Sequence, residues 1–288
     1  MISPEGPPSP CTPVRTHAED GARLVACAHG GQVLGWSPAG DQRERLWLSP
    51  LARCGPGEAI RGGVPVVFPQ FADRGPLPKH GRARDRAWEL DTGSDGAPVA
   101  RVACRLRDDE LTRRIWPHRF TLTLVAEASG DRLTMTLGVR NEAPADGEPF
   151  SFTAALHTYL AAEVRVARLH GLAEHPAEDH TAGGAPVRLP RGPLPARGPL
   201  DVAVRDTRGP VRLENGVDDE LEIRCTGDGG FDSLVVWNPG EQHGLSDVPP
   251  EGAGQFLCVE PARLAPVTLA PQGVWRGTAR FTALVPSP

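Results

Sequence analysis

Residues 120–139 read FTLTLVAEASGDRLTMTLGV, and this stretch decides the fold class. Apolar residues occupy alternate positions on both sides of Ser129-Gly130-Asp131, which is the two-residue period of a half-buried β-strand. A turn triplet between two alternating runs predicts an antiparallel hairpin. The segment is therefore predicted to form two long paired strands.

The rest of the chain repeats this pattern of short strands and turns. Its 288 residues include 33 Gly and 31 Pro, which interrupt helices and separate short apolar runs. Residues 22–38 predict another hairpin around Gly30-Gly31, and about sixteen or more strands are expected overall, with almost no helix. We predict an all-β, antiparallel fold in one domain, residues 16–288, preceded by a Pro- and Ser-rich disordered tail, residues 1–15. Residues 174–211 are predicted to be rich in loops.

Composition argues against several classes of protein. The net charge is −5, and no Lys/Arg run is interleaved with aromatic residues, so a nucleic-acid partner is not expected. No stretch approaches the roughly 18 apolar residues of a membrane span, and the first residues do not resemble a signal peptide. We therefore expect a cytoplasmic protein with reduced thiols.

Metal-binding patterns are also missing from the sequence. The six cysteines are scattered and form no CxxC pair, which argues against a zinc ribbon. His170, His175 and His180 recur every five residues, a spacing that fits no common metal motif, and we interpret them as loop histidines. Neither a metal nor a cofactor is expected.

Residues 59–90, AIRGGVPVVFPQFADRGPLPKHGRARDRAWEL, place several polar side chains around a short apolar run. Arg61, His80 and Arg84 are the candidates for binding a polar or anionic small molecule, because guanidinium groups offer forked donors to oxygen atoms. The alternative is that they are exposed loop charges. Arg82, Arg84 and Arg86 would all face one way if this segment were a strand.

His157 and Glu260 are the candidate catalytic pair. His157 lies in the strand-like run 154–160, and Glu260 is expected to end the apolar strand FLCVE. A histidine and a carboxylate suffice as an acid and base pair that moves protons on and off oxygen atoms of a substrate. Taken singly, each has a structural alternative, namely a buried hydrogen-bonded histidine and a surface carboxylate.

Asp232 and Trp237 lie in FDSLVVWNPG and are candidate substrate-binding residues. An indole face can stack on an apolar C–H surface of a ligand, and a carboxylate can accept hydrogen bonds from hydroxyl groups. A core tryptophan is the alternative for Trp237.

Three segments in order, RGGVPVVFPQF with HGRARDRAW, SFTAALHTYLAAEV, and FDSLVVWNPG with FLCVEPARL, resemble the signature of the hexose-6-phosphate mutarotases. These form the glucose-6-phosphate 1-epimerase branch of the aldose 1-epimerase family. The resemblance spans about residues 20–284.

This resemblance implies a galactose-mutarotase-like β-supersandwich with a concave ligand-binding sheet. It implies a cofactor-free isomerase that interconverts α and β anomers by acid/base ring opening, with Glu260 as the base and His157 as the acid. It also places Arg61, His80 and Arg84 among the substrate-binding residues, with arginines on the 6-phosphate.

Some positions depart from the family pattern. Arg82 stands at an aromatic position, Ala177 at a tyrosine, Asp206 or Thr207 at an acidic residue, and Gly240 at a tryptophan. They suggest a changed substrate rim and keep two alternatives open, a non-catalytic carbohydrate-binding or sensing protein and an epimerase for a different sugar. The expected partner is a small-molecule sugar or sugar phosphate, bound by a monomer without a membrane or nucleic-acid partner.

Overall fold

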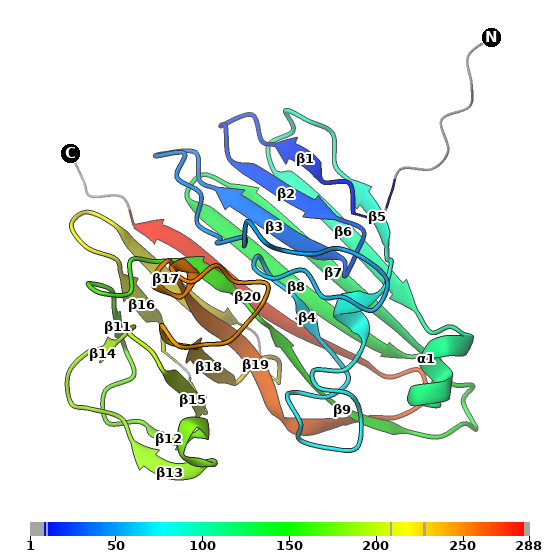
Figure 1. Cartoon of the computed structure of the whole chain (residues 1–288). Coiled ribbons are helices and arrows are strands. Elements are labelled where there is room, and N and C mark those ends of the chain that lie inside the picture. Colours follow the sequence, from blue (N-terminus) through cyan, green and yellow to red (C-terminus); the bar gives the residue numbers. More distant parts are fainter. Residues whose placement is uncertain (1–8, 10, 208, 227–228, 285–288) are drawn as a thin grey trace.

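The computed structural model describes residues 9, 11–207, 209–226 and 229–284. Their regular secondary structure is almost entirely β-strand, arranged in three antiparallel sheets (Figure 1). The α-helix α1 (Glu110–Ile115) and the 3₁₀ turns η1 (Ala83–Asp85), η2 (His180–Ala182) and η3 (Gly252–Gly254) are short. The prediction of an all-β antiparallel fold with very little helix is confirmed.

The largest sheet has nine strands. In spatial order they are β14 (Leu194–Pro195), β11 (Arg168–His170), β16 (Val211–Glu214), β17 (Glu220–Thr226), β20 (Val274–Leu284), β8 (Arg132–Asn141), β7 (Phe120–Ser129), β6 (Ala100–Arg107) and β5 (Glu89–Thr92).

The second sheet has eight strands and carries the site described below. Its order is β13 (Ala185–Arg188), β12 (Pro176–Asp179), β15 (Leu200–Arg205), β18 (Ser233–Asn238), β19 (Phe256–Leu269), β9 (Phe150–Leu156) and β4 (Val66–Val67), with β10 (Tyr159–Ala161) also paired to β19. A third sheet, β1 (Val14–His17), β2 (Arg23–Cys27) and β3 (Gln32–Ser37), lies over β6 and β7 (Figure 1).

Both predicted hairpins are present. β7 and β8 pair from Phe120↔Asn141 to Ser129↔Arg132, and Gly130, at φ +55°, forms the turn with Asp131. The alternate apolar residues of the quoted stretch are buried, as the period of two requires. β2 and β3 pair around Gly30 and Gly31, which both adopt positive φ.

The main core lies between the sheets and takes every second residue of the central strands. On β19, Leu257 and Val259 belong to this core, and on β18, Leu234 and Val236 do. The intervening residues face the opposite side of the sheet. That outer face carries two smaller apolar clusters (Val67, Phe71, Ala155, Ala203, Val235, Ala262 and Leu264; Trp47, Tyr159, Val248, Phe256 and Cys258).

The structure corrects the expectation for residues 174–211. Strands β12 and β15 lie inside this segment, as do the edge strands β13 and β14. The prolines had suggested loops, but Pro186 and Pro195 lie on edge strands. An edge strand tolerates proline because the missing N–H can face away from the neighbouring strand.

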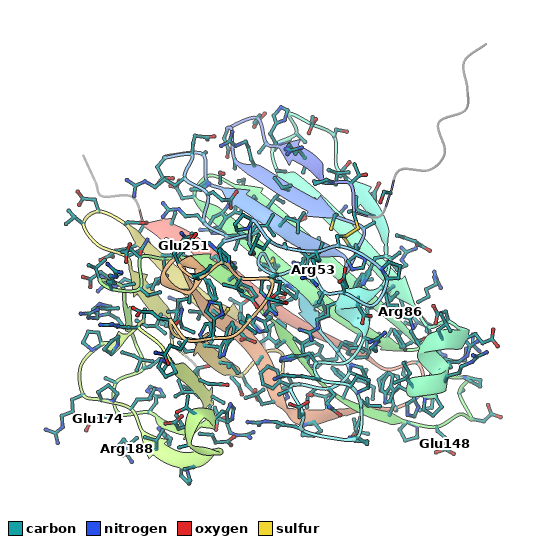
Figure 2. All side chains as sticks on the ribbon, in the orientation of Figure 1. Arg53, Arg86, Glu148, Glu174, Arg188 and Glu251 are labelled. Atoms are coloured by element: carbon teal, nitrogen blue, oxygen red, sulfur yellow. A yellow bond between two sulfur atoms is a disulfide. The ribbon has the colours of Figure 1, made fainter. Side chains whose placement is uncertain are left out.

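The N-terminal segment also differs from its prediction. β1 begins at Val14, within the predicted tail, whose residues 1–8 and 10 lie outside the described part of the chain. That residues 16–288 form one domain stays a prediction. Cys11 and Cys54 form a disulfide (Figure 2), so the expectation that all thiols are reduced is wrong for this pair. Among the described residues, no helix is long and apolar enough to cross a membrane.

Candidate active site

A pocket of about 260 Å³ opens on the outer face of the eight-stranded sheet. Strands β15, β18 and β19 form its floor, and loops from distant parts of the chain form its walls. The lining residues are Arg61, Phe71, Ala72, Lys79, His80, Arg84, His157, His180, Asp201, Val235, Trp237, Leu245 and Glu260.

Glu260 lies on the floor, in the middle of β19. The sequence predicted that it ends a strand, but β19 continues through Pro261 to Leu269. Glu260 is opposite Val235 of β18 and is only 1% exposed. Leu257 and Val259 face the core, so the alternation of the strand directs Glu260 to the pocket side. A buried carboxyl group in a central strand is held rigidly by its backbone.

His157 lies at the break between β9 and β10 rather than inside one continuous strand. Tyr159 pairs with Cys258 in antiparallel register, so His157, two residues before Tyr159, lies beside Glu260, two residues after Cys258. His157 Nε2 lies 3.4 Å from Glu260 Oε1. Within the described part of the chain, His157 Nδ1 and Glu260 Oε2 are buried and have no hydrogen-bond partner. The fold thus brings the predicted pair together, and each residue keeps one polar atom that can still form a hydrogen bond.

Burial favours the neutral forms of both groups. It raises the pKa of Glu260 well above the usual value, and the charge of Asp201 adds to this while Arg84 opposes it. Burial lowers the pKa of His157 well below its usual value, and His80, Arg84 and Arg61 add to the effect. Both shifts favour the form of the pair in which Glu260 carries the proton and His157 is neutral.

Arg61 is fixed at the pocket wall by two partners. Its Nε donates to Asp247 Oδ2 at 3.0 Å, and its Nη1 donates to the Tyr159 hydroxyl at 2.9 Å. The Tyr159 ring stacks on His157 with centroids 4.9 Å apart. Arg61 therefore lies in the pocket as predicted, with part of its donor capacity already used.

His80 enters from the loop between β4 and η1. The Ala72 N–H donates to His80 Nδ1 at 3.3 Å, so Nδ1 is an acceptor and Nε2 carries the proton. Burial lowers the pKa of His80 to about 3, and Arg84, Lys79 and Arg61 contribute. His80 thus offers a neutral N–H donor to a ligand.

Arg84 lies in η1, so the alternation proposed for Arg82, Arg84 and Arg86 as a strand is wrong. Arg84 lines the pocket and donates to the Lys79 carbonyl at 3.3 Å. Arg82 instead pairs with Asp85 at 3.1 Å and is not part of the pocket wall. A short 3₁₀ turn separates side chains that a strand would have aligned.

Trp237 lines the pocket as predicted, with its ring centroid 5.8 Å from that of His157. Asp232 does not line it. Its carboxylate pairs with Arg263 and accepts from the Ser233 hydroxyl at 2.9 Å. Asp232 precedes β18, and this nearby guanidinium satisfies it, so its prediction as a substrate-binding residue is not supported by the geometry.

The pocket contains residues that sequence reasoning did not select. Asp201 lies on β15 opposite Trp237, and His180 begins η2 with Nδ1 2.9 Å from Asp201 Oδ1. Lys79 and Phe71 come from the same loop as His80. The run LDVAV around Asp201 was a strand signal, but only the β15–β18 pairing places that residue at the site.

The four positions that depart from the family pattern lie away from the pocket. Asp206 and Thr207 follow β15 at its far end, where the Thr207 N–H donates to the Asp232 carbonyl at 2.9 Å. Ala177 faces the main core, and Gly240 forms a turn with Asn238. None of these positions lines the pocket, so the geometry does not support the expected change of the substrate rim there.

In the described part of the chain, two groups of side chains have the composition of metal ligands. His157, Cys258 and Glu260 bring ligand atoms within 4.8 Å of one another, as do Cys11, His29 and Cys54. The disulfide occupies both sulfur atoms of the second group. The charges of Arg61 and Arg84 act on His157 and oppose a dication in the first. The first group is better suited to proton transfer than to holding a metal.

Comparison with known proteins agrees with this geometry. A family model described as aldose 1-epimerase matches residues 14–282. Two curated proteins named "Putative glucose-6-phosphate 1-epimerase" are similar to this chain. The one from Cenchrus ciliaris is 33% identical over 270 residues, covering 90% of this chain and 80% of the relative. The one from Escherichia coli K12 is 32% identical over 248 residues, covering 81% and 77%.

Solved structures share the fold. The "putative mutarotase (YeaD)" of Salmonella typhimurium superposes with a TM-score of 0.80 and 24% identity, covering 92% of this chain and 88% of that one. A galactose mutarotase-like protein from Lactobacillus casei superposes with a TM-score of 0.74 and 14% identity, covering 95% and 100%. The predicted galactose-mutarotase-like architecture is confirmed.

Proposed function

The chain belongs to the aldose 1-epimerase family, and from this membership and the pocket geometry we propose that it interconverts the α and β anomers of a hexose 6-phosphate. The observation that carries the proposal is the buried pair His157 and Glu260, 3.4 Å apart on the floor of a pocket with basic walls. The curated relatives of both organisms carry the name of this reaction.

In the mechanism that we propose, Glu260 removes the proton of the C1 hydroxyl and His157 protonates the ring oxygen. The bond between C1 and the ring oxygen breaks, and an open-chain aldehyde forms. Rotation about C1–C2 presents the other face of the carbonyl. On ring closure Glu260 returns its proton to the oxygen on C1, and His157 takes the proton of the hydroxyl group that attacks C1. Both residues regain their starting forms, and no proton is gained or lost.

The pair must first reach its working form. Burial favours neutral Glu260 and neutral His157. Moving one proton from Glu260 to His157 gives carboxylate and imidazolium with no exchange with solvent, because both forms of the pair hold one proton.

The basic side chains of the wall favour a phosphorylated sugar. Arg61 is already paired with Asp247, and Lys79 lies 3.8 Å from the exposed Asp73. Among the described residues, Arg84 donates only to a backbone carbonyl. Arg84 and Lys79 are thus the groups best able to bind a phosphate, through charge-assisted hydrogen bonds. The neutral N–H of His80 and the face of Trp237 would contact the sugar.

Exchange NMR of α- and β-glucose 6-phosphate tests the proposal. The wild type should accelerate anomer exchange, and Glu260→Gln should lose about 10²- to 10⁴-fold of that rate, as expected for one acid/base group. Glu127→Gln is a matched control, because Glu127 is a half-exposed residue of β7. No acceleration by wild type, with saturable binding of the sugar phosphate, would refute catalysis and favour a sugar-binding protein.

A further inference from the structure

Arg74 and His180 connect two walls of the pocket. Arg74 belongs to the loop between β4 and η1, which supplies Phe71, Lys79 and His80 to the site. His180 begins η2 at the β12 end of the sheet. We propose that these two residues are positioning residues, forming a latch that orients Asp201 towards the substrate. This proposal rests on the proposed function.

The contacts run in one continuous line. Arg74 Nη2 lies 2.6 Å from His180 Nε2 and donates to Glu178 Oε2 at 2.8 Å. His180 Nδ1 lies 2.9 Å from Asp201 Oδ1. Arg205 Nε donates to Glu178 Oε1 at 3.0 Å, so the Glu178 carboxylate that accepts from Arg74 is itself held in place. Residues more than a hundred positions apart in the chain thus meet at the pocket mouth.

The direction of each hydrogen bond follows from donor chemistry. A guanidinium group can only donate, so His180 Nε2 must be the acceptor of the bond from Arg74. Nδ1 of a neutral imidazole then carries the proton and donates to Asp201. Arg74 therefore fixes the tautomer of His180, and His180 fixes one oxygen of Asp201. The other oxygen stays available as an acceptor for a sugar hydroxyl.

The loop that carries Arg74 is internally braced. The Gln70 side chain donates to the carbonyls of Ala72 and Leu77 at 3.0 and 2.9 Å, and its oxygen accepts from the Leu77 N–H. The Phe71 N–H donates to the Thr153 hydroxyl of β9 at 2.7 Å. These contacts hold the base of the loop. The contact of Arg74 with His180 then connects the outer side of the loop to η2.

The latch is not part of the core. The side chains of Arg74, Glu178 and His180 are 29%, 32% and 21% exposed. Partly exposed polar contacts contribute little to stability, so removing them should leave the fold intact. These side chains lie between the loop and Asp201, which points to a role in ligand binding. Their removal should have little effect on proton transfer between His157 and Glu260.

Three substitutions of His180 separate its two contacts. His180→Asn keeps an N–H donor near the Nδ1 position and loses the Arg74 acceptor. His180→Gln keeps an acceptor near the Nε2 position and loses the donor to Asp201. His180→Ala loses both. His170→Ala is the matched control, because His170 pairs with Glu214 at 2.6 Å in the nine-stranded sheet.

The assay measures kcat and KM for glucose 6-phosphate by exchange NMR, and its Kd by calorimetry, with thermal unfolding to check folding. We expect His180→Ala to raise KM and Kd roughly tenfold, the size of one lost hydrogen bond to a charged group, with kcat within about twofold. His180→Asn should recover most of the affinity and His180→Gln little of it. Arg74→Ala should weaken binding with the same kcat.

The outcomes distinguish the two proposals. An active wild type with unchanged KM in folded His180→Ala overturns the latch alone. Equal KM for His180→Asn and His180→Ala overturns the orienting role of the Nδ1 donor. A wild type that neither binds nor interconverts glucose 6-phosphate overturns the latch together with the proposed function.

Discussion

Breaking the Cys11–Cys54 disulfide should destabilise the protein by a calculable amount. The bond closes a chain segment of 43 residues. The chain-entropy relation for cross-links gives about 4 kcal/mol for a loop of this size at 25 °C. A 288-residue chain has an unfolding entropy of about 0.6 kcal/mol per kelvin near its midpoint, so the melting temperature should fall by about 6–7 °C.

Thermal unfolding by calorimetry measures this effect with and without a thiol reductant. Cys11→Ser should melt at the temperature of the reduced wild type and should not respond to reductant. Cys225→Ser is the control, because Cys225 is a free cysteine on β17 and its loss leaves the cross-link intact.

A shift below about 2 °C would refute the reasoning. Either the bond would be absent in solution, or the unfolded chain would already hold the two residues close together. Titration of free thiols in the unfolded protein separates these explanations, since four free cysteines are expected beside the disulfide.

Three further predictions concern the site. Glu260→Gln should stabilise the folded protein relative to wild type, and increasingly so above about pH 4.5. The folded-state pKa of Glu260 is raised, so its carboxyl group contributes stability below its unfolded pKa and loses that contribution as pH rises through the folded pKa. Equal urea midpoints for both proteins at pH 8 would contradict this. Gly81→Ala should lower the free energy of unfolding by more than about 3 kcal/mol and reduce activity, because at φ +68° the new Cβ would lie 2.0 Å from the Phe68 carbonyl oxygen. Gly130→Ala, where the new Cβ meets open space, should lower it by about 1–2 kcal/mol in the same urea titration. Arg84→Gln should raise KM for glucose 6-phosphate at least tenfold and leave KM for glucose within about twofold, as measured by exchange NMR; equal effects on both sugars would remove Arg84 from phosphate binding.

The sequence predicted the strand pattern and the floor of the pocket because both depend on local periodicity. The alternation of residues 120–139 became the β7–β8 hairpin. His157 and Glu260 lie beside each other, although their positions within the strands differ from prediction. That they perform catalysis stays a prediction until the exchange experiment.

The walls of the pocket were harder to predict because they depend on which strands become neighbours. Asp201 reaches the site through the pairing of β15 with β18, in a segment whose glycines and prolines suggested loops. His180 was interpreted as a loop histidine, and it does begin a short turn, but that turn adjoins β15. Asp232 lies close in sequence to Trp237, yet Arg263 satisfies its charge away from the pocket.

The cysteines show the same limit. A spacing of 43 residues carries no local signal, and only the folded chain brings Cys11 against Cys54. Expecting reduced thiols from scattered cysteines was wrong because sequence spacing says nothing about distance across a β fold.

The division between floor and walls bears on how this pocket could change over evolution. Glu260 sits in a strand that is hydrogen-bonded on both sides, so a substitution that shifts it would disturb several strands at once. The walls come from a self-braced loop and from η2 near the edge of the sheet, where insertions and replacements disturb few neighbours. New substrate preferences can therefore arise by substitutions in the loop around Arg74 and at His180, while the proposed proton-transfer pair on the floor is kept.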